Sequence, residues 1–216
     1  MIMIHACPDR MWYVTGYLIP SMIAQGIPRN TIRIWNDTDG AGCLMSCMNA
    51  FLDCEGDGGT WHLQDDVLIC RDFAEQIAGY TEGIVCGFCH TLFEPFNRPM
   101  VGDVPAVFMF NSFPCIRIPN KLARECAQWF IEEVKHRKIY QKYVEQKSHD
   151  DTVWADFIRE CYPHERVYNV APALVEHIDW LIGGSVVNQW RGYICRASYW
   201  EDEDLIIDLA RQLARR

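Results

Sequence analysis

The sequence predicts an α/β fold, with one domain whose mostly parallel central sheet is flanked by helices. Three observations predict it. The chain has 216 residues and half of them are apolar, which is enough for one substantial core. Strand-like and helix-like segments alternate through the first third, as in parallel strands joined by right-handed crossovers. No internal repeat or low-complexity linker divides the chain, so residues 1–216 are expected to form one domain.

The first third supplies the strands and helices of this pattern. Short apolar and β-branched runs predict three strands, at residues 1–6, 31–35 and 60–63. A broad apolar face predicts a helix over residues 11–25, and Pro20 inside it predicts a kink or break because proline lacks the N–H of a helical hydrogen bond. A second helix is expected over residues 43–52.

Past Asp66 the pattern is less regular. Strands are expected at residues 83–90 and 106–111, and helices at residues 71–79, 121–138, 150–158 and 204–216. Pro119 suits the first turn of the long helix, and the acids at 150–151 suit a helix start. The basic segment 135–147 is expected to be a solvated surface, although such a segment can also steer a nucleic-acid acceptor.

Each of the first three strands ends in a polar loop. The loops are residues 8–10, 37–39 and 65–66. The carboxyl ends of parallel strands meet at one edge of a sheet, where α/β proteins bind their ligands. A nucleotide lying across this edge would meet all three loops.

The third loop consists of two adjacent carboxylates, Asp65 and Asp66. Two like charges at such an edge repel each other unless a cation lies beside them. A hard divalent ion is commonly held by one or two carboxylates, with water and phosphate oxygens in its other positions. The pair therefore predicts a metal–diphosphate site, with a solvated acidic turn as the alternative.

Composition narrows the class of protein. The formal charge of −9 argues against a broad grip on a nucleic-acid backbone, without excluding a local basic groove. Eleven cysteines, an odd number scattered through apolar segments, indicate reduced thiols in a cytoplasmic protein. The first residues lack the basic region of a signal peptide, and no apolar run approaches the roughly 18–20 residues of a spanning helix.

The segment from Cys86 to His90 reads Cys-Gly-Phe-Cys-His. This is the attachment pattern of a c-type haem, and Cys-x-x-Cys alone suggests redox or zinc chemistry. No second such pair exists in the sequence to complete a zinc site, and no export signal supports haem attachment. The favoured interpretation is a buried strand in which cysteine packs as a small apolar residue.

Three motifs follow one another along the chain. They are Gln-Asp-Asp-Val at 64–67 with Arg-Asp-Phe at 71–73, Asp-Asp-Thr-Val-Trp at 150–154, and Pro-Ala-Leu-Val-Glu-His-Ile at 172–178, the last followed by a serine-containing turn and an arginine-bearing strand over 184–198. Together they resemble small GT-A-fold glycosyltransferases of the lipooligosaccharide and phage-encoded types. Gln64 stands where that family has a first acid, which puts in doubt any role that needs three acids.

This resemblance implies a single GT-A-like (Rossmann-like) domain. Residues 1–110 would be the nucleotide-sugar-binding half, residues 111–200 the acceptor side and residues 201–216 a C-terminal helix. The implied reaction transfers a sugar from a nucleotide-diphosphate donor to an acceptor hydroxyl, generally with Mn²⁺ or Mg²⁺ bridging the diphosphate. A glycan, a protein and a hydroxymethylated DNA base all remain open as acceptors.

The resemblance also assigns metal ligands. Asp66 would ligate the ion directly, and Asp65 would ligate it or hold a ribose or sugar hydroxyl. His177 would be a third contact to metal or phosphate, and imidazole suits Mn²⁺ better than Mg²⁺. Taken alone, His177 also fits a core or surface histidine.

Asp150 and Asp151 are the candidates for the general base that takes the acceptor's proton, with a helix cap as the alternative role. The remaining predicted donor contacts, for which turn formation or surface ion pairing is the alternative, are Ala6, Pro8, Arg10, Asp37, Arg191 and Arg196.

Two other functions fit the same fold. A nucleotidyltransferase also uses an α/β sheet and paired acids on a metal, but it usually carries a Gly-rich basic loop after the first strand, and residues 7–10 are not one. A non-catalytic nucleotide-binding module is the non-enzymatic alternative.

Overall fold

The computed structural model describes residues 1–88, 101–105, 113–183, 197 and 200–215. Within these residues, seven strands form a central sheet in the order β2-β1-β3-β7-β5-β8-β6, and two short strands form a second sheet, β4-β9. The strands are β1 (Ile2–Ala6), β2 (Ile32–Asn36), β3 (Gly59–Gln64), β4 (Val67–Ile69), β5 (Ile84–Cys86), β6 (Gly102–Pro105), β7 (Cys115–Pro119), β8 (Arg166–Asn169) and β9 (Val175–His177).

Strand directions confirm the predicted sheet. β1 is parallel to both β2 and β3, and β5 is parallel to β8. β7 runs antiparallel between β3 and β5, and β6 runs antiparallel to β8 at the edge. Five of the seven strands of this described sheet therefore point the same way. The first three predicted strands are all present.

The helical segments are η1 (Pro8–Arg10), α1 (Met11–Tyr13), η2 (Val14–Leu18), α2 (Ile19–Ala24), η3 (Arg29–Thr31), α3 (Cys43–Leu52), α4 (Phe73–Ala78), α5 (Asn120–Glu133), α6 (Lys138–Gln146), α7 (Asp150–Cys161) and α8 (Glu203–Leu213). The helix predicted over 11–25 is continuous, but η2 is a π-helical turn directly before Pro20. Proline has no N–H to donate to the preceding turn, and the wider π-helical turn accommodates the loss of that hydrogen bond. No helix among the described residues combines the length and the apolar character needed to cross a membrane.

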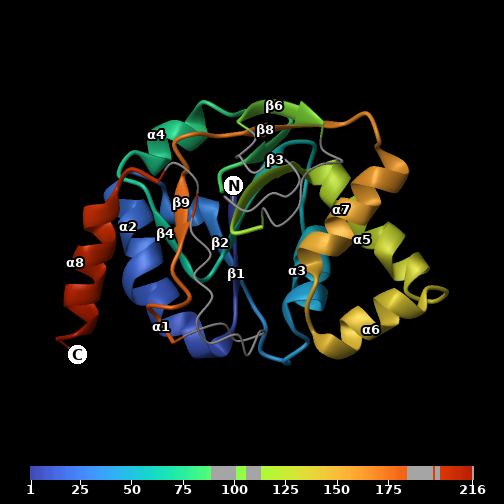
Figure 1. The fold of residues 1–216 in the computed structure, drawn as a ribbon, viewed down its shortest axis with the longest axis horizontal. Coiled ribbons are helices and arrows are strands. Elements are labelled where there is room, and N and C mark those ends of the chain that lie inside the picture. Colours follow the sequence, from blue (N-terminus) through green and yellow to red (C-terminus); the bar gives the residue numbers. More distant parts are fainter. Residues whose placement is uncertain (89–100, 106–112, 184–196, 198–199, 216) are drawn as a thin grey trace.

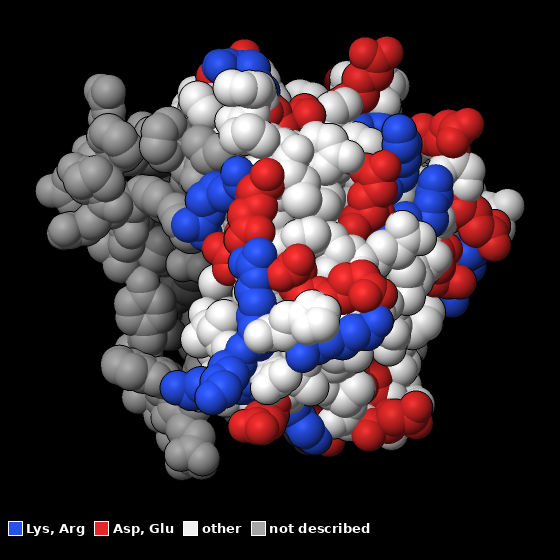
Figure 2. Space-filling model, turned by 90° about the vertical axis from the view of Figure 1, so that its right-hand side faces the viewer, with Lys and Arg blue, Asp and Glu red and all other residues white. Residues whose placement is uncertain are grey.

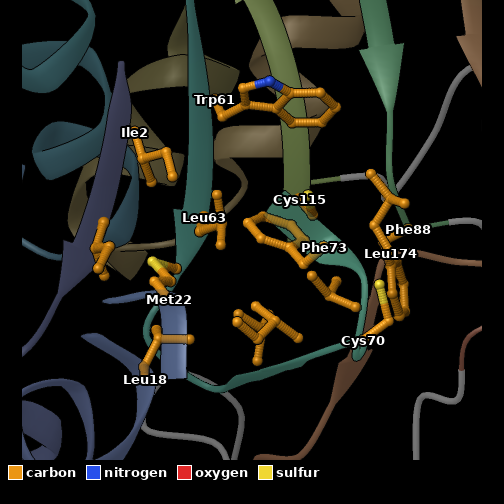
Figure 3. Close-up of a cluster of buried hydrophobic side chains, with 14 of the residues drawn as sticks. Ile2, Leu18, Met22, Trp61, Leu63, Cys70, Phe73, Phe88, Cys115 and Leu174 are labelled. Atoms are coloured by element: carbon orange, nitrogen blue, oxygen red, sulfur yellow. The ribbon is translucent and has the colours of Figure 1, made fainter. Parts of the chain in front are cut away.

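The helices cover both faces of the sheet (Figure 1). On one face lie α1, α2, α4 and α8 together with the small β4-β9 sheet, and on the other lie α3, α5, α6 and α7. Because both faces are covered, the central strands bury side chains on both sides. The hydrophobic core on the side of α1, α2, α4 and α8 contains Ile2 and Ile4 of β1 and Trp61 and Leu63 of β3. Leu18 and Phe73 belong to the same core (Figure 3).

Three predicted elements of the second half either differ from the observed ones or lie partly outside the described residues. The expected strand at 83–90 is described only as β5, in which Cys86 is fully buried, so the strand interpretation is confirmed for this part while Cys89 and His90 lie outside the described residues. The strand expected at 106–111 also lies outside them. The long helix ends at Glu133 rather than near residue 138, and α6 begins at Lys138 after a short turn.

Charges on the α5–α7 face are mixed in sign. Figure 2 shows acidic and basic side chains interspersed there. Lys135 pairs with Glu132 at 2.7 Å, and Arg137 pairs with Glu133 and Glu160. Pairing of this kind is typical of a solvated helix surface rather than of a phosphate-binding patch.

Two histidines are packed against each other between the sheet and α3. His5 Nε2 and His62 Nδ1 lie 2.9 Å apart, and the His62 ring contacts Phe51 and the Cys54 thiol. Burial lowers the pKa of His5 to about 4, and burial together with the charge of His5 lowers the pKa of His62 well below its ordinary value. Both rings are therefore neutral in the folded protein at pH 7.

This pair predicts acid instability. A histidine with a depressed folded-state pKa binds its proton more readily in the unfolded chain, so stability is complete above the unfolded pKa of about 6.5 and falls as the pH drops below it. We expect this pair's contribution to the free energy of unfolding, measured by urea titration, to decline between about pH 6.5 and pH 4. His62→Asn should flatten this slope, whereas replacing the exposed His164 should leave it unchanged. An unchanged slope in His62→Asn would contradict the assignment.

Candidate active site

The ends of three parallel strands bring the predicted polar loops together. In the order β2-β1-β3, Ala6 pairs with Asn36 and His5 with Gln64, so the loops after these strands are neighbours at one edge. The Asp37 amide donates to the Ala6 carbonyl at 2.8 Å. The predicted convergence of the three loops is therefore confirmed.

The acid pair lies buried at this edge, bound to an arginine from the first loop. Arg10 Nη1 donates to Asp65 Oδ1 at 2.8 Å and to Asp66 Oδ2, and the Cys7 amide donates to Asp65 Oδ2 at 2.7 Å. Arg10, Asp65 and Asp66 are each only 5–6% exposed. The alternative of a solvated acidic turn is therefore wrong. The sequence did not predict that Arg10 binds both acids.

The small β4-β9 sheet brings a histidine to the same place. Val67, the residue after the acid pair, is paired with His177, and the Ile178 amide donates to the Asp66 carbonyl at 2.8 Å. His177 Nε2 consequently lies 3.1 Å from Asp66 Oδ2, and its Nδ1 lies 3.7 Å from Asp179 Oδ1. The structure thus assembles Asp65, Asp66 and His177, the three residues predicted as metal contacts.

The two acids have opposite pKa shifts. Burial raises the pKa of Asp65, and the adjacent charge of Asp66 raises it further. Burial would also raise the pKa of Asp66, but the charges and hydrogen bonds of His177 and Arg10 hold it well below its ordinary value. Asp66 is therefore the firmly ionised member of the pair at neutral pH.

Two buried oxygen atoms at this edge have no hydrogen-bond donor among the described residues. They are Asp66 Oδ1 and Asn36 Oδ1. A buried acceptor without a donor is costly, so these oxygens are places where a water, an ion or a ligand group would complete the site. Asn36 escaped the sequence analysis, although it directly precedes Asp37.

The free oxygen of Asp66 fits a cation. Asp65 uses both oxygens within the protein, so the ion would be held by Asp66 Oδ1. His177, whose Nε2 lies 3.1 Å from Asp66 Oδ2, would become the second ligand once its imidazole is neutral and turned from that oxygen. The described residues contain no group of three or more acidic, histidine or cysteine side chains in metal-binding geometry. A divalent ion here would take its remaining ligands from phosphate and water, as Mg²⁺ and Mn²⁺ commonly do.

The second polar loop is closed by its own acid and by a lysine from the α6–α7 connection. Asp37 accepts from the amides of Ala41 and Gly42, each at 2.8 Å, and the Lys147 carbonyl accepts from the Cys43 amide. A Cβ on Gly42 would lie 2.2 Å from the Lys147 side chain, so only glycine fits this approach. Asp37 therefore supports its loop, and its predicted contact with the nucleoside is untested.

The loop after β2 contacts the α6–α7 connection, and this contact places the second acidic motif beside the same edge of the sheet. Asp150 Oδ1 accepts from the Cys43 thiol at 3.4 Å, while Asp151 Oδ1 accepts from the Thr152 amide. His149, not either acid, occupies the N-cap of α7, and it has a positive φ of 77°. Strained backbone of this kind is common at functional sites.

Burial and the charge of Asp151 raise the pKa of Asp150 to about 7, and burial raises the pKa of Asp151. A carboxyl with a pKa near the working pH suits general base catalysis. His149 is the N-cap residue, but Asp151 binds a first-turn amide of α7 and so keeps part of the alternative role of supporting the helix start.

The other predicted contacts divide into two groups. Ala6 is buried at the end of β1 and Pro8 is exposed at the start of η1, so both line the edge. Arg191 and Arg196 lie outside the described residues, as does most of the segment 184–198. One residue that was not predicted also supports the site. The Tyr13 hydroxyl donates to the carbonyl of Val67, the residue after the acid pair, at 2.8 Å.

Comparisons with known proteins give weak structural likenesses. No family model and no curated protein matches the chain. HddC from Yersinia pseudotuberculosis has a TM-score of 0.38 at 10% identity, over 78% of this chain and 89% of that chain. The same protein complexed with GMP-PN has a TM-score of 0.32 at 9% identity, over 58% of this chain and 80% of that chain. Similarity at this level does not identify a function.

Proposed function

We propose that this protein is a glycosyltransferase that moves a sugar from a nucleotide-diphosphate donor to an acceptor hydroxyl, with a divalent cation at Asp66. The observation that carries the proposal is the approach of His177 to Asp66, 3.1 Å apart, from the first and third of the motifs that resemble this family. The buried Oδ1 of Asp66, for which the described part of the chain supplies no donor, supports it, because that oxygen is where an ion would be held.

The residues at this edge of the sheet would have separate roles in binding the donor. Asp66 and His177 would hold Mn²⁺ or Mg²⁺, which would neutralise charge on the departing nucleotide diphosphate. Asp65 would act indirectly, since its two oxygens hold Arg10 and the Cys7 amide in place. Arg10 would keep the acid pair from repelling itself before the donor arrives. Asn36 Oδ1 would accept a hydrogen bond from a hydroxyl group of the sugar-nucleotide substrate.

Proton transfer would fall to the second motif. A buried carboxyl with a pKa of about 7 is partly ionised at neutral pH, so Asp150 is the better candidate for the base that takes the acceptor's proton. Asp151 is already bonded to the Thr152 amide and would orient the start of α7. General base assistance of this kind contributes roughly 10²–10⁴-fold to a rate.

A panel of nucleotides tests the donor half of this proposal. UDP, GDP, CMP and dTDP are each added with and without Mn²⁺, and thermal unfolding is followed. One nucleotide at about 100 times its Kd should raise the melting temperature by roughly 5 °C or more, and only with the metal. Mn²⁺ alone is the control. Absence of protection by every nucleotide, with or without metal, would refute the proposal.

A further inference from the structure

A hollow of about 460 Å³ lies at the other end of the sheet from the acid pair. Its walls include Ile84, the first residue of β5, and Arg166, the first residue of β8. These strands run in the same direction as β3, whose carboxyl end leads to Asp65, so the hollow belongs to the opposite edge. Nothing in the proposed reaction uses it.

Two tyrosine rings line the hollow. The centroids of Tyr80 and Tyr168 are 5.6 Å apart, with their planes tilted by 39°. Tyr168 is 44% exposed although it lies on a sheet strand, while its neighbour Val167 points into the core on the other face. Trp61 packs edge-on against Tyr80 and fixes that ring. The result is a splayed aromatic platform, open to solvent at Tyr168, whose ring faces offer an apolar stacking surface.

A buried arginine builds the wall beside this platform. Arg117 is 6% exposed, and its guanidinium donates to the Gly83 carbonyl at 2.6 Å and to the Thr81 carbonyl. Gly59 lies against the guanidinium, where a Cβ would approach Nη2 to 2.4 Å, so a larger residue at 59 would have to displace this end of the Arg117 side chain. The loop from Thr81 to Gly83 is thereby held in a preorganised shape, as binding sites require.

Acidic side chains outnumber basic ones in the lining of the hollow, which has Glu82, Asp103 and Glu165 against Arg166. Arg166 Nε lies 2.6 Å from Asp103 Oδ2, and the charge of Glu82 acts on the buried Arg117. Glu165 adds a further acceptor. An anionic ligand would be repelled by this net negative rim, whereas a neutral ligand with many hydroxyls would find charged donors and acceptors, whose hydrogen bonds are the stronger kind.

We infer that this hollow is a carbohydrate-binding site, in which a sugar ring packs its apolar C–H face on Tyr80 and Tyr168 and hydrogen-bonds through its hydroxyls to Arg166, Asp103 and Glu165. The site fits a segment of glycan chain, since an open hollow of this volume admits one or two sugar units. It goes beyond the proposed transfer reaction and needs neither metal nor nucleotide.

Saturation-transfer NMR with neutral hexasaccharides tests the site. Maltohexaose, cellohexaose, chitohexaose and mannohexaose are offered to the full chain without nucleotide. At least one should bind, and Tyr168→Ala should weaken its Kd by at least about fivefold because the stacking surface is lost. Tyr168→Phe keeps the ring and should bind normally, as should Ile139→Ala, a change at an equally exposed residue on α6.

The outcomes separate this inference from the proposed function. Asp66→Asn should bind the sugar as the unchanged protein does, because it alters only the other edge. Arg166→Gln, which leaves the platform intact, should weaken binding and serves if Tyr168→Ala does not fold. Binding of tetramethylammonium or hexalysine that depends on Tyr168, with no sugar bound, would make the hollow a cation site and overturn the inference. Absence of binding by every hexasaccharide would overturn it equally.

Discussion

Replacing Asp66 with asparagine is expected to lower sugar transfer, or the slow hydrolysis of the donor, by at least about 100-fold. The amide keeps the size of the side chain but removes the negative charge that Asp66 carries at neutral pH, where His177 and Arg10 hold its pKa low. Without this charge the buried Oδ1 position no longer attracts a divalent ion, so Mn²⁺-dependent protection by the nucleotide should disappear as well.

The matched control is Asp9→Asn, which removes an exposed acid from the neighbouring loop of the same edge. Release of nucleoside diphosphate from a sugar nucleotide measures activity, and thermal unfolding confirms that both variants fold. Wild-type turnover in Asp66→Asn, together with intact Mn²⁺-dependent nucleotide binding, would show that the metal assignment is wrong.

Sequence patterns predicted the half of the fold that depends on local periodicity. Apolar runs with polar loops after residues 6, 36 and 64 were sufficient to predict three parallel strands and one shared edge, because side-chain alternation and short connections are local properties. The edge also identified Asp65 and Asp66, since ligands of α/β proteins bind at the carboxyl ends of the strands.

Tertiary contacts produced what the sequence did not predict. β4 and β9 are three residues each, too short for a periodic signal, and their pairing alone places His177 beside Asp66. Only the resemblance to a glycosyltransferase motif pointed to that histidine. Likewise, nothing local distinguishes an arginine that binds phosphate from one that, like Arg10, binds two acids more than fifty residues away.

Removal of Arg10 should have the largest effect on stability. Arg10→Met keeps much of the side chain's length and apolar surface but leaves Asp65 and Asp66 buried without their shared cation. Breaking a buried ion pair from one side costs about 3–5 kcal/mol, because the remaining charge cannot return to water. We expect a loss of this size in the free energy of unfolding at pH 7, measured by urea titration.

A double-mutant cycle with Asp65→Asn shows whether the loss comes from the acid pair. With one carboxylate neutralised, Asp66 keeps His177 as a partner, so Arg10→Met should cost at least about 1 kcal/mol less than in the unchanged protein. Arg33→Met is the matched control, since its side chain is 44% exposed and lies 3.6 Å from Asp53, and exposed pairs contribute about 1 kcal/mol or less. Equal costs for Arg10 and Arg33, with no coupling to Asp65, would mean that the acids are not held by Arg10, and the edge would then need another source of positive charge to keep two buried carboxylates together.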